Sequence, residues 1–369
     1  MSQTLGFTDE MRILIVDDSL IFRRVVEEVF KGEQGIKVVG SVMNGVKAME
    51  FIKSSANPPD LVTLDLEMPE MNGLETLEAI QKFNDSAGSG IGVIMVSAHT
   101  IEGAGITITA LENGAFDFVT KPNAENALEN MDSLRKHLMM RVRQFGLMRK
   151  KNGRGLPAVA GSAKHPVVVG AKPASAKAVS VVVIGVSTGG PKALVAVMPA
   201  ISDAVEVPIL VVQHMPPIFT SSLAESLNSK CRHEVVEASN GEEVRNDRIY
   251  IAPGGRHMLV GKTGGKTSIV VNDRPAENGC RPSVDVLFRS AALAYSGGIV
   301  AVVLTGMGAD GSQALAALKR AGAHILAQDQ ATSVVWGMPG SAVATGHVDE
   351  VLPLTEIPPA VKRERMRRE

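Results

Sequence analysis

Five polar residues in the first third of the chain each follow an apolar run, and their types suit phosphoryl transfer. The runs are "ILIV", "LVTL", "VIMV" and "FDFVT", and the residues that follow them are Asp17 with Asp18, Asp65, Ser97 and Lys121. If these runs are parallel strands, their carboxyl ends meet at one edge of a sheet and the five side chains converge there. Three carboxylates so close together repel one another unless a cation lies among them, and such oxygen ligands suit Mg²⁺.

This constellation predicts a phosphoacceptor site on Asp65. Mg²⁺ would bridge the carboxylates and the incoming phosphoryl group, Lys121 would pair with phosphoryl oxygens, and the Ser97 hydroxyl would donate a hydrogen bond to one of them. The structural alternative is that the first two carboxylates cap a helix that begins near Ser19, and that Asp65 only opens a loop. The occurrence of all five residues at strand ends, in this order, favours the chemical interpretation.

A serine in a glycine-rich turn is the second candidate for chemistry. Ser187 lies in "VVVIGVSTGGPKAL", where a β-branched run leads into glycines, a proline and an apolar pattern at helical spacing, which predicts a strand-to-helix turn. The pattern Gly185-x-Ser187-x-Gly189 matches the nucleophile elbow of hydrolases, but it arises easily by chance. The same turn suits a loop whose amides hold an anion or a nucleotide while Ser187 caps the helix.

A serine nucleophile needs a histidine base and a carboxylate that orients the base. Among eight histidines, His214 is the best placed because it ends the run "ILVVQ", and Asp310 lies in the glycine-rich turn of "VVLTGMGADG". Parallel strands would bring Ser187, His214 and Asp310 to one sheet edge, which predicts a catalytic triad. Alone, His214 could be a structural or surface residue, and Asp310 could cap the helix that follows it. The order serine, histidine, aspartate differs from that of the α/β-hydrolases and indicates a separate lineage.

Two α/β regions must position these residues, because 369 residues are too many for one typical core. Five strand-like runs separated by helix-length segments occupy the chain from residue 12 to about residue 135. Six more runs follow Ser180: "SVVVIGV", "VPILVVQH", "RIYIAPGG", "TSIVVND", "GIVAVVLTG" and "AHILAQD". The predicted fold class is α/β, with two doubly wound parallel-sheet domains, the first five-stranded and the second Rossmann-like.

The predicted domain boundaries follow changes in composition. We expect a phosphoacceptor domain over residues 11–132, a flexible basic linker over 133–178 and a catalytic domain over 179–356. No acidic residue occurs between Asp132 and Asp203, and the Gly, Pro, Ala, Ser and Lys content there indicates a solvated tether with some helix at its start. The alternative is a segment that docks on an acidic surface. The terminal "KRERMRRE" is predicted to be a frayed helix end.

Composition excludes several classes of protein. A formal net charge of −1 and the lack of a base-reading motif give no reason to expect a nucleic-acid partner. Cys231 and Cys280 are too few for a disulfide scaffold and form no Cys-x-x-Cys pair, so we expect both to be buried small residues. No basic leader and no segment of membrane-spanning length occurs, so we expect a cytoplasmic protein that does not insert into membranes.

The first region resembles the receiver domains of two-component response regulators. The segments that carry the resemblance are "ILIVDDS", "LVTLDLEMPEMNGLE", "VIMVSA" and "GAFDFVTKP", over about residues 11–125. The resemblance implies Mg²⁺-dependent phosphorylation of Asp65, with a histidine kinase as phosphodonor. The switch residues that it implies are Ser97, Lys121 and Phe118, the last at the aromatic position that reorients on activation in that family.

The second region resembles the methylesterase domain of chemotaxis response regulators. The matching segments are "GVSTGGP", "VVQHMPP", "IAPGG", "LTGMGADG" and "WGMPGSA", over about residues 178–355. The resemblance implies a phosphorylation-controlled esterase that removes methyl groups from glutamyl methyl esters of chemoreceptors. Some members of the family also deamidate receptor glutamines. No cofactor is implied for this domain.

The same resemblance assigns roles to matching residues. Ser187 is the implied nucleophile, His214 the general base and then acid, and Asp310 the group that orients His214. The backbone N–H of Met307 is implied to hold the oxyanion, with assistance from the Thr188 hydroxyl. The alternatives from other classes are a second domain that only binds a nucleotide or protein through its glycine-rich loops, and a DNA-binding output domain, for which no helix-turn-helix candidate appears.

Overall fold

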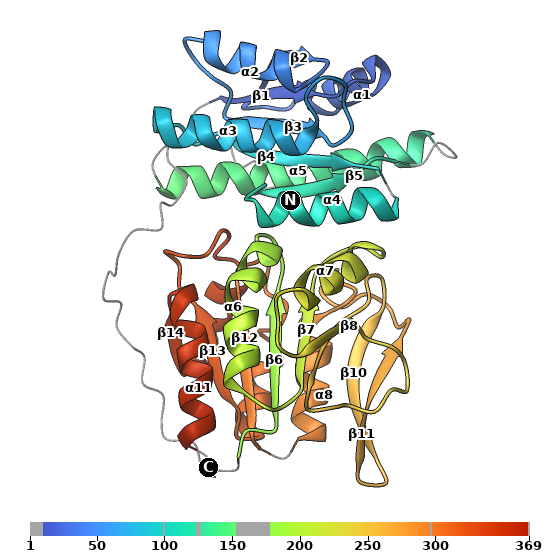
Figure 1. The fold of residues 1–369 in the computed structure, drawn as a ribbon, viewed down its shortest axis with the longest axis vertical. Coiled ribbons are helices and arrows are strands. Elements are labelled where there is room, and N and C mark those ends of the chain that lie inside the picture. Colours follow the sequence, from blue (N-terminus) through green and yellow to red (C-terminus); the bar gives the residue numbers. More distant parts are fainter. Residues whose placement is uncertain (1–9, 99, 123–126, 153–177, 296, 368–369) are drawn as a thin grey trace. The chain divides into compact units, whose positions relative to one another are not determined.

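The computed structural model describes residues 10–98, 100–122, 127–152, 178–295 and 297–367. These residues make up two compact units, one that ends at residue 152 and one that begins at residue 178. Each unit is built on a parallel sheet with helices packed against it (Figure 1), which confirms the predicted fold class.

The N-terminal sheet has five parallel strands in the order β2-β1-β3-β4-β5. The strands are β1 (Met11–Val16), β2 (Ile36–Val42), β3 (Leu61–Asp65), β4 (Gly92–Ser97) and β5 (Asp117–Thr120). Every residue of β3 and β4 is buried. Burial on both faces explains why these strands appear in the sequence as continuous apolar runs without alternation.

Helices connect the strands of this unit and cover its sheet. They are α1 (Leu20–Phe30), α2 (Gly45–Ser54), α3 (Gly73–Ala87), α4 (Ile101–Glu112) and α5 (Ala127–Asn152). Ser19 is the N-cap of α1, since its hydroxyl accepts a hydrogen bond from the Phe22 N–H over 3.3 Å. The side chain that caps this helix is therefore that of Ser19, and not that of Asp17 or Asp18 as the structural alternative assumed.

Residues 133–152 belong to helix α5 rather than to a linker, so the predicted domain boundary at residue 132 is wrong. Leu134, Leu138, Val142 and Phe145 are all buried. Their spacing of three or four residues places them on one helix face, which packs against the unit. Arg141 and Arg149 of the same helix form ion pairs with Asp117 and Asp60 of the unit. The rest of the predicted linker, up to residue 177, lies outside the described residues.

The C-terminal sheet has seven parallel strands in the order β14-β13-β12-β6-β7-β9-β8. The strands are β6 (Val181–Val186), β7 (Ile209–Gln213), β8 (Glu234–Glu237), β9 (Arg248–Ile251), β12 (Ile299–Val303), β13 (His324–Gln328) and β14 (Glu350–Leu352). The strand order reverses at β6, and loops after the carboxyl ends of β6, β7 and β12 carry the residues predicted to do chemistry.

A hairpin of β10 (His257–Thr263) and β11 (Lys266–Asn272) lies outside this sheet. The prediction that "TSIVVND" is a strand is correct, but its placement in the parallel sheet is wrong. The turn Gly264–Gly265 has positive φ at both residues, 59° and 85°, which is the geometry of a two-residue hairpin. Buried residues of β10, β11 and α8 pack in the same hydrophobic cluster as residues of the main sheet.

The helices of the C-terminal unit are α6 (Gly190–Ala204), α7 (Phe219–Asn228), α8 (Val284–Ala294), α9 (Leu315–Arg320), α10 (Met338–Ala344) and α11 (Ile357–Arg367), with a short 3-10 turn at Leu354–Glu356. α6 contacts both α7 and α11, whereas α8 contacts α9 and the hairpin strand β10. These two groups of helices cover opposite faces of the doubly wound sheet.

The charged segment is packed helix as far as Arg367, so the prediction of a frayed end there and of a domain end at residue 356 is wrong. Residues 368–369 lie outside the described residues. Ile357, Ala360 and Val361 in α11 are fully buried, and α11 contacts α6. The Arg365 guanidinium donates a hydrogen bond over 3.0 Å to the carbonyl of Ala204. The apolar residues at helical spacing hold α11 in place, and the charged Glu364, which is 3% exposed, is buried with them.

Among the helices described here, none combines the length and the apolar character that crossing a bilayer would require.

Candidate functional site

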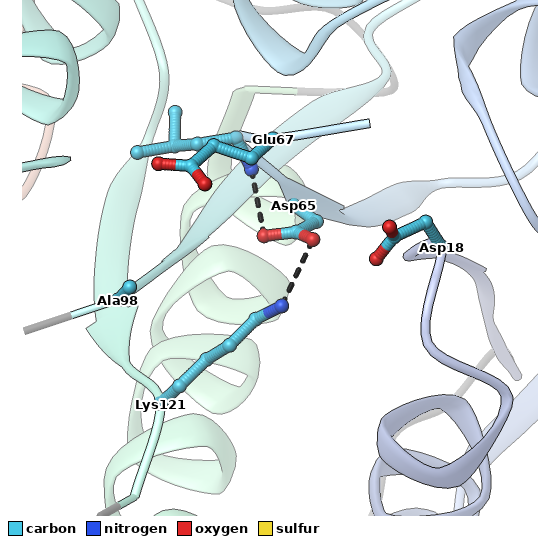
Figure 2. A pocket seen from close by; sticks show the side chains of 6 residues that line it. Asp18, Asp65, Glu67, Ala98 and Lys121 are labelled. Atoms are coloured by element: carbon cyan, nitrogen blue, oxygen red, sulfur yellow. Dashed lines mark hydrogen bonds and ion pairs between the residues drawn. The ribbon is translucent and has the colours of Figure 1, made fainter. Parts of the chain in front are cut away.

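The carboxyl edge of the N-terminal sheet holds an acidic pocket (Figure 2). The Lys121 ammonium lies 2.8 Å from a carboxylate oxygen of Asp17 and 2.8 Å from one of Asp65. The other Asp65 oxygen accepts the Leu66 N–H over 2.9 Å. Asp17 and Asp65 are only 2% and 4% exposed, so the lysine neutralises two carboxylates that water cannot reach freely.

The charges of this pocket shift the pKa values of its groups. Burial and the neighbouring Asp17 charge raise the pKa of Asp65 to about 6, although the hydrogen bond and charge of Lys121 act to lower it. Burial lowers the pKa of Lys121, but its contacts with Asp17 and Asp65 outweigh burial and the net shift is upward. The site therefore favours an additional positive charge beside Asp65 at neutral pH.

The donor set of the pocket fits Mg²⁺. Carboxylate oxygens of Asp17, Asp18 and Asp65 all lie within 4.8 Å of one another. A cavity of about 190 Å³ opens beside them, and Figure 2 shows Asp18 facing Asp65 across it. Hard oxygen ligands with one exposed member suit an ion that keeps part of its water shell. The predicted convergence of these three residues with Lys121 is thus present in the structure.

Ser97 and Phe118 are not among the residues that line the pocket, whereas Ala98 is. The Ser97 hydroxyl is buried, donates to the Ala98 carbonyl over 3.1 Å and accepts from the Thr107 hydroxyl over 2.8 Å. Phe118 is 4% exposed within β5. The structure therefore places the Ser97 hydroxyl against α4, and the roles of Ser97 and Phe118 remain predictions.

Ser187 is held in a turn between β6 and α6 at the carboxyl edge of the C-terminal sheet. Its N–H donates to the Thr305 carbonyl over 3.0 Å. The loop after β12 passes so close that a Cβ at Gly306 would lie 2.7 Å from the Ser187 Cβ, so only glycine fits there. The N-cap of α6 is Gly189, with φ of 78° and no side-chain cap. The alternative in which Ser187 caps α6 therefore fails.

His214 and Asp310 form the central pair of this edge. The His214 Nε2 lies 2.8 Å from Asp310 Oδ2, and the carboxylate is 2% exposed. Since a carboxylate accepts hydrogen bonds, Nε2 carries the proton and Nδ1 of the neutral ring is the acceptor. The His214 N–H donates to the Val186 carbonyl over 3.1 Å, which ties His214 to the strand that ends at Ser187. Among the described residues, no hydrogen bond joins the Ser187 hydroxyl to His214.

Asp310 is fixed by the first turn of α8 rather than by the helix that follows it, so the alternative as a cap of α9 is wrong. Its oxygens accept the Val284 N–H over 2.7 Å, the Asp285 N–H over 3.1 Å and the Ser283 hydroxyl over 2.8 Å. These donors belong to a helix N-terminus, where the peptide dipoles favour a negative charge. The arrangement keeps Asp310 ionised and in one orientation.

The same contacts shift the pKa values of the pair. Burial raises the pKa of Asp310, but His214, Val284 and Ser283 outweigh burial and hold the pKa at about 2. Burial lowers the pKa of His214, but the hydrogen bond and charge of Asp310, together with Cys280, outweigh burial and raise the pKa to about 9. The pair therefore attracts a proton to the imidazole and stabilises its cationic form.

Sequence reasoning missed three residues that support this edge. The Gln213 amide N–H₂ donates to the carbonyls of Ser187, over 3.0 Å, and His214, over 3.1 Å, and so links the two turns. Ser283 begins α8 and bonds Asp310. Cys280 places its sulfur 3.7 Å from His214 Nδ1. Both Cys280 and Cys231 are only partly buried, so the expectation that they are buried is wrong. Of the three, only Gln213 had a signal in the sequence, because it is a polar residue at the end of an otherwise apolar strand.

Met307 and Thr188 border Ser187 on the side of the β12 loop. Met307 follows Gly306 and is 37% exposed. Among the described residues, its N–H donates to no partner, which leaves it available to an oxyanion. The Thr188 carbonyl accepts the Thr305 hydroxyl over 3.0 Å, which fixes the turn against the β12 loop.

The class of protein follows from these two sites. The response regulator receiver domain family matches residues 13–131, so the chain is a response regulator whose output unit carries a hydrolase-like site. The CheB methylesterase family matches residues 182–361.

Known relatives match nearly the whole chain. The protein-glutamate methylesterase/protein-glutamine glutaminase of Desulfotalea psychrophila is 42% identical over 358 residues, 94% of this chain and 96% of that protein. The protein of the same name from Trichodesmium erythraeum is 40% identical over 349 residues, 94% of this chain and 97% of that protein. The chain therefore belongs to the CheB methylesterase family of chemotaxis response regulators.

A solved structure is also similar to part of the chain. The catalytic domain of the Thermotoga maritima CheB methylesterase is 42% identical and covers 50% of this chain and 98% of that one, with a TM-score of 0.49.

We expect the substitution Asp310→Asn to lower the pKa of His214 from about 9, because burial then acts without the opposing carboxylate. An NMR titration of the histidine ring protons measures the shift. The control is Asp247→Asn, which removes an exposed carboxylate and leaves the pKa of His214 in place. A His214 resonance that titrates at the same pH in wild type and Asp310→Asn would contradict this coupling.

The pKa shift also predicts how stability depends on pH. His214 binds its proton more tightly in the folded chain, where the pKa is about 9, than at its ordinary value of 6.5. Its contribution to the free energy of unfolding is therefore complete below pH 6.5 and is lost as the pH rises through 9.

Proposed function

We propose that this chain is a phosphorylation-activated protein-glutamate methylesterase whose catalytic residues are Ser187, His214 and Asp310. The observation that carries the proposal is the hydrogen bond between His214 and the buried Asp310, which holds Nε2 on the carboxylate and leaves Nδ1 as the nitrogen that can act on Ser187 at the same sheet edge. The substrate is a γ-glutamyl methyl ester on a cytoplasmic segment of a chemoreceptor, and the protein acts in the cytoplasm.

In the first half of the reaction, the Ser187 oxygen attacks the ester carbonyl carbon. His214 Nδ1 takes the hydroxyl proton as the bond forms and then gives it to the departing methoxy oxygen, so that methanol leaves. Asp310 holds Nε2–H in place and stabilises the imidazolium between these steps. The hydrogen bond from the Ser187 hydroxyl to Nδ1 forms in the substrate complex, as catalytic hydrogen bonds often tighten only when substrate is bound.

The negative charge of the tetrahedral intermediate needs hydrogen-bond donors. We assign this role to the Met307 N–H, which has no partner among the described residues, with help from the Thr188 hydroxyl. The close approach of Gly306 to Ser187 puts this loop beside the reacting carbon. Removal of one oxyanion donor typically costs ~100–1000-fold in turnover.

Water completes the reaction at the acyl-enzyme. His214 Nδ1 takes a proton from the water as its oxygen attacks the carbonyl carbon, and returns the proton to the Ser187 oxygen as the acyl bond breaks. The product is the free glutamate. A glutamine side chain at the same position would release ammonia in place of methanol, so the same residues support glutaminase activity.

The receiver unit controls this activity through Asp65 in our proposal, with a histidine kinase as phosphodonor. Asp17, Asp18 and Asp65 would hold Mg²⁺, which when bound neutralises the charge of the transferred phosphoryl group. Lys121 loses its contact with the Asp65 carboxylate on phosphorylation and pairs with phosphoryl oxygens. Ser97 donates to a phosphoryl oxygen after its hydroxyl turns away from Ala98, and Phe118 repacks with it.

The triad assignment predicts that Ser187→Ala lowers methanol release from methylated receptor membranes by at least ~1000-fold, because no other hydroxyl replaces the nucleophile. Gas chromatography or a coupled alcohol assay measures the methanol. Ser229→Ala, which changes an exposed serine, is the matched control and retains activity. Full methanol release by a folded Ser187→Ala chain would refute the assignment, and a unit that only binds a ligand would release none in either form.

The receiver assignment predicts that a small-molecule phosphodonor with Mg²⁺ stimulates methanol release by the wild-type chain but not by Asp65→Asn, which lacks the phosphoacceptor. The measured quantity is the ratio of rates with and without phosphodonor. Asp85→Asn, an exposed carboxylate on α3, keeps the wild-type ratio. Equal stimulation of wild type and Asp65→Asn would show that control does not act through this residue.

A further inference from the structure

The Cys280 side chain lies beside Nδ1 of the catalytic imidazole. Its sulfur lies 3.7 Å from His214 Nδ1, the nitrogen that Asp310 does not bind. The Cys280 N–H and carbonyl are paired with Glu277, so a closed turn in the segment before α8 fixes the position of the thiol. The residue is partly exposed rather than buried.

The two atoms have the separation that one tetrahedral metal ion requires. With Zn–S near 2.3 Å and Zn–N near 2.0–2.1 Å, two ligands at the tetrahedral angle are ~3.6 Å apart. The observed distance between Sγ and Nδ1 is 3.7 Å. A zinc ion between them needs little movement of either side chain.

The surroundings of His214 also match those of a metal ligand. Metal-bound histidines usually donate their other ring N–H to a carboxylate, which fixes the tautomer and makes the ligating nitrogen more basic. Asp310 makes this contact with Nε2 over 2.8 Å, and the donors at the start of α8 hold Asp310. His214, Cys280 and Asp310 have potential ligand atoms within 4.8 Å of one another.

We propose that His214 Nδ1 and Cys280 Sγ form an inhibitory Zn²⁺ site in the esterase unit, with water completing the coordination. Zinc binding releases the thiol proton and, below pH 9, the second proton of the imidazolium, which Nδ1 carries. The ion then occupies the nitrogen lone pair that would otherwise take the Ser187 proton. The inhibitory effect rests on the proposed esterase function, whereas the binding itself does not.

Ligand chemistry separates this site from the receiver pocket. The receiver pocket offers only carboxylate oxygens, which suit Mg²⁺, whereas a thiolate and an imidazole select a softer ion such as Zn²⁺. Among the described residues, Cys231 belongs to no cluster of potential metal ligands. Burial raises the pKa of its thiol to about 11, which disfavours the thiolate that metal binding needs.

The binding test uses the full-length Ser187→Ala chain with Co²⁺ as a spectroscopic substitute for Zn²⁺. A thiolate-to-cobalt charge-transfer band is expected, and Zn²⁺ should abolish it by displacement. The band should disappear when Cys280→Ser is added and persist when Cys231→Ser is added. Absence of the band, or its persistence with Cys280→Ser, overturns the proposal, and circular dichroism verifies that each variant is folded.

The inhibition test measures methanol release at increasing Zn²⁺ with excess Mg²⁺ present. Zinc should inhibit the wild-type chain, and a zinc-selective chelator should restore its activity. The Cys280→Ser chain should require at least ~10-fold more zinc for half-inhibition. The rate of each chain is compared with its own rate without zinc. Equal sensitivity of both chains overturns the proposal. If the wild-type chain releases no methanol without zinc, the esterase function fails, and the cobalt experiment still decides the metal site.

Discussion

The hydrogen bond between Asp310 and His214 is the interaction on which the esterase unit depends. A carboxylate that is 2% exposed is costly to bury as an anion. Two N–H groups of the first turn of α8, the Ser283 hydroxyl and the imidazole offset this cost. Asp310 is thereby ionised and held in one orientation, and the neutral His214 ring is confined to the tautomer that keeps its proton on Nε2, with Nδ1 beside Cys280.

The rest of the C-terminal fold brings Ser187 close to this pair. β6, β7 and β12 are neighbours in a parallel sheet, so the turns after them meet at one edge. Gly306 allows the β12 loop to touch Ser187, and the Gln213 amide joins the carbonyls of Ser187 and His214. In the receiver unit the same kind of edge brings carboxylates together, but there the neutralising group is Lys121 and the remaining charge suits a hard cation. One architecture thus supports two chemistries through the residues at its strand ends.

The sequence was most informative at the ends of strands. Buried parallel strands are continuous apolar runs, and a polar residue directly after such a run lies at the functional edge, which is why Asp65, Lys121 and His214 could be identified. The partners of Asp310 could not, because the start of α8 is about 25 residues away in the chain and only the fold brings them together. Composition was a poor guide in α5 and α11, where frequent charges obscured apolar residues at helical spacing. The hairpin of β10 and β11 was missed since its turn, Gly264–Gly265, was not considered.

Covalent labelling by a fluorophosphonate tests the central claim most directly, because such a reagent reacts only with a serine whose hydroxyl a neighbouring base activates. Mass spectrometry of the labelled full-length chain should find the adduct on Ser187, and the labelling rate should fall steeply in both His214→Gln and Asp310→Asn. Labelling of Ser187 at an undiminished rate in Asp310→Asn, or no adduct on Ser187 in the wild-type chain, would contradict the account.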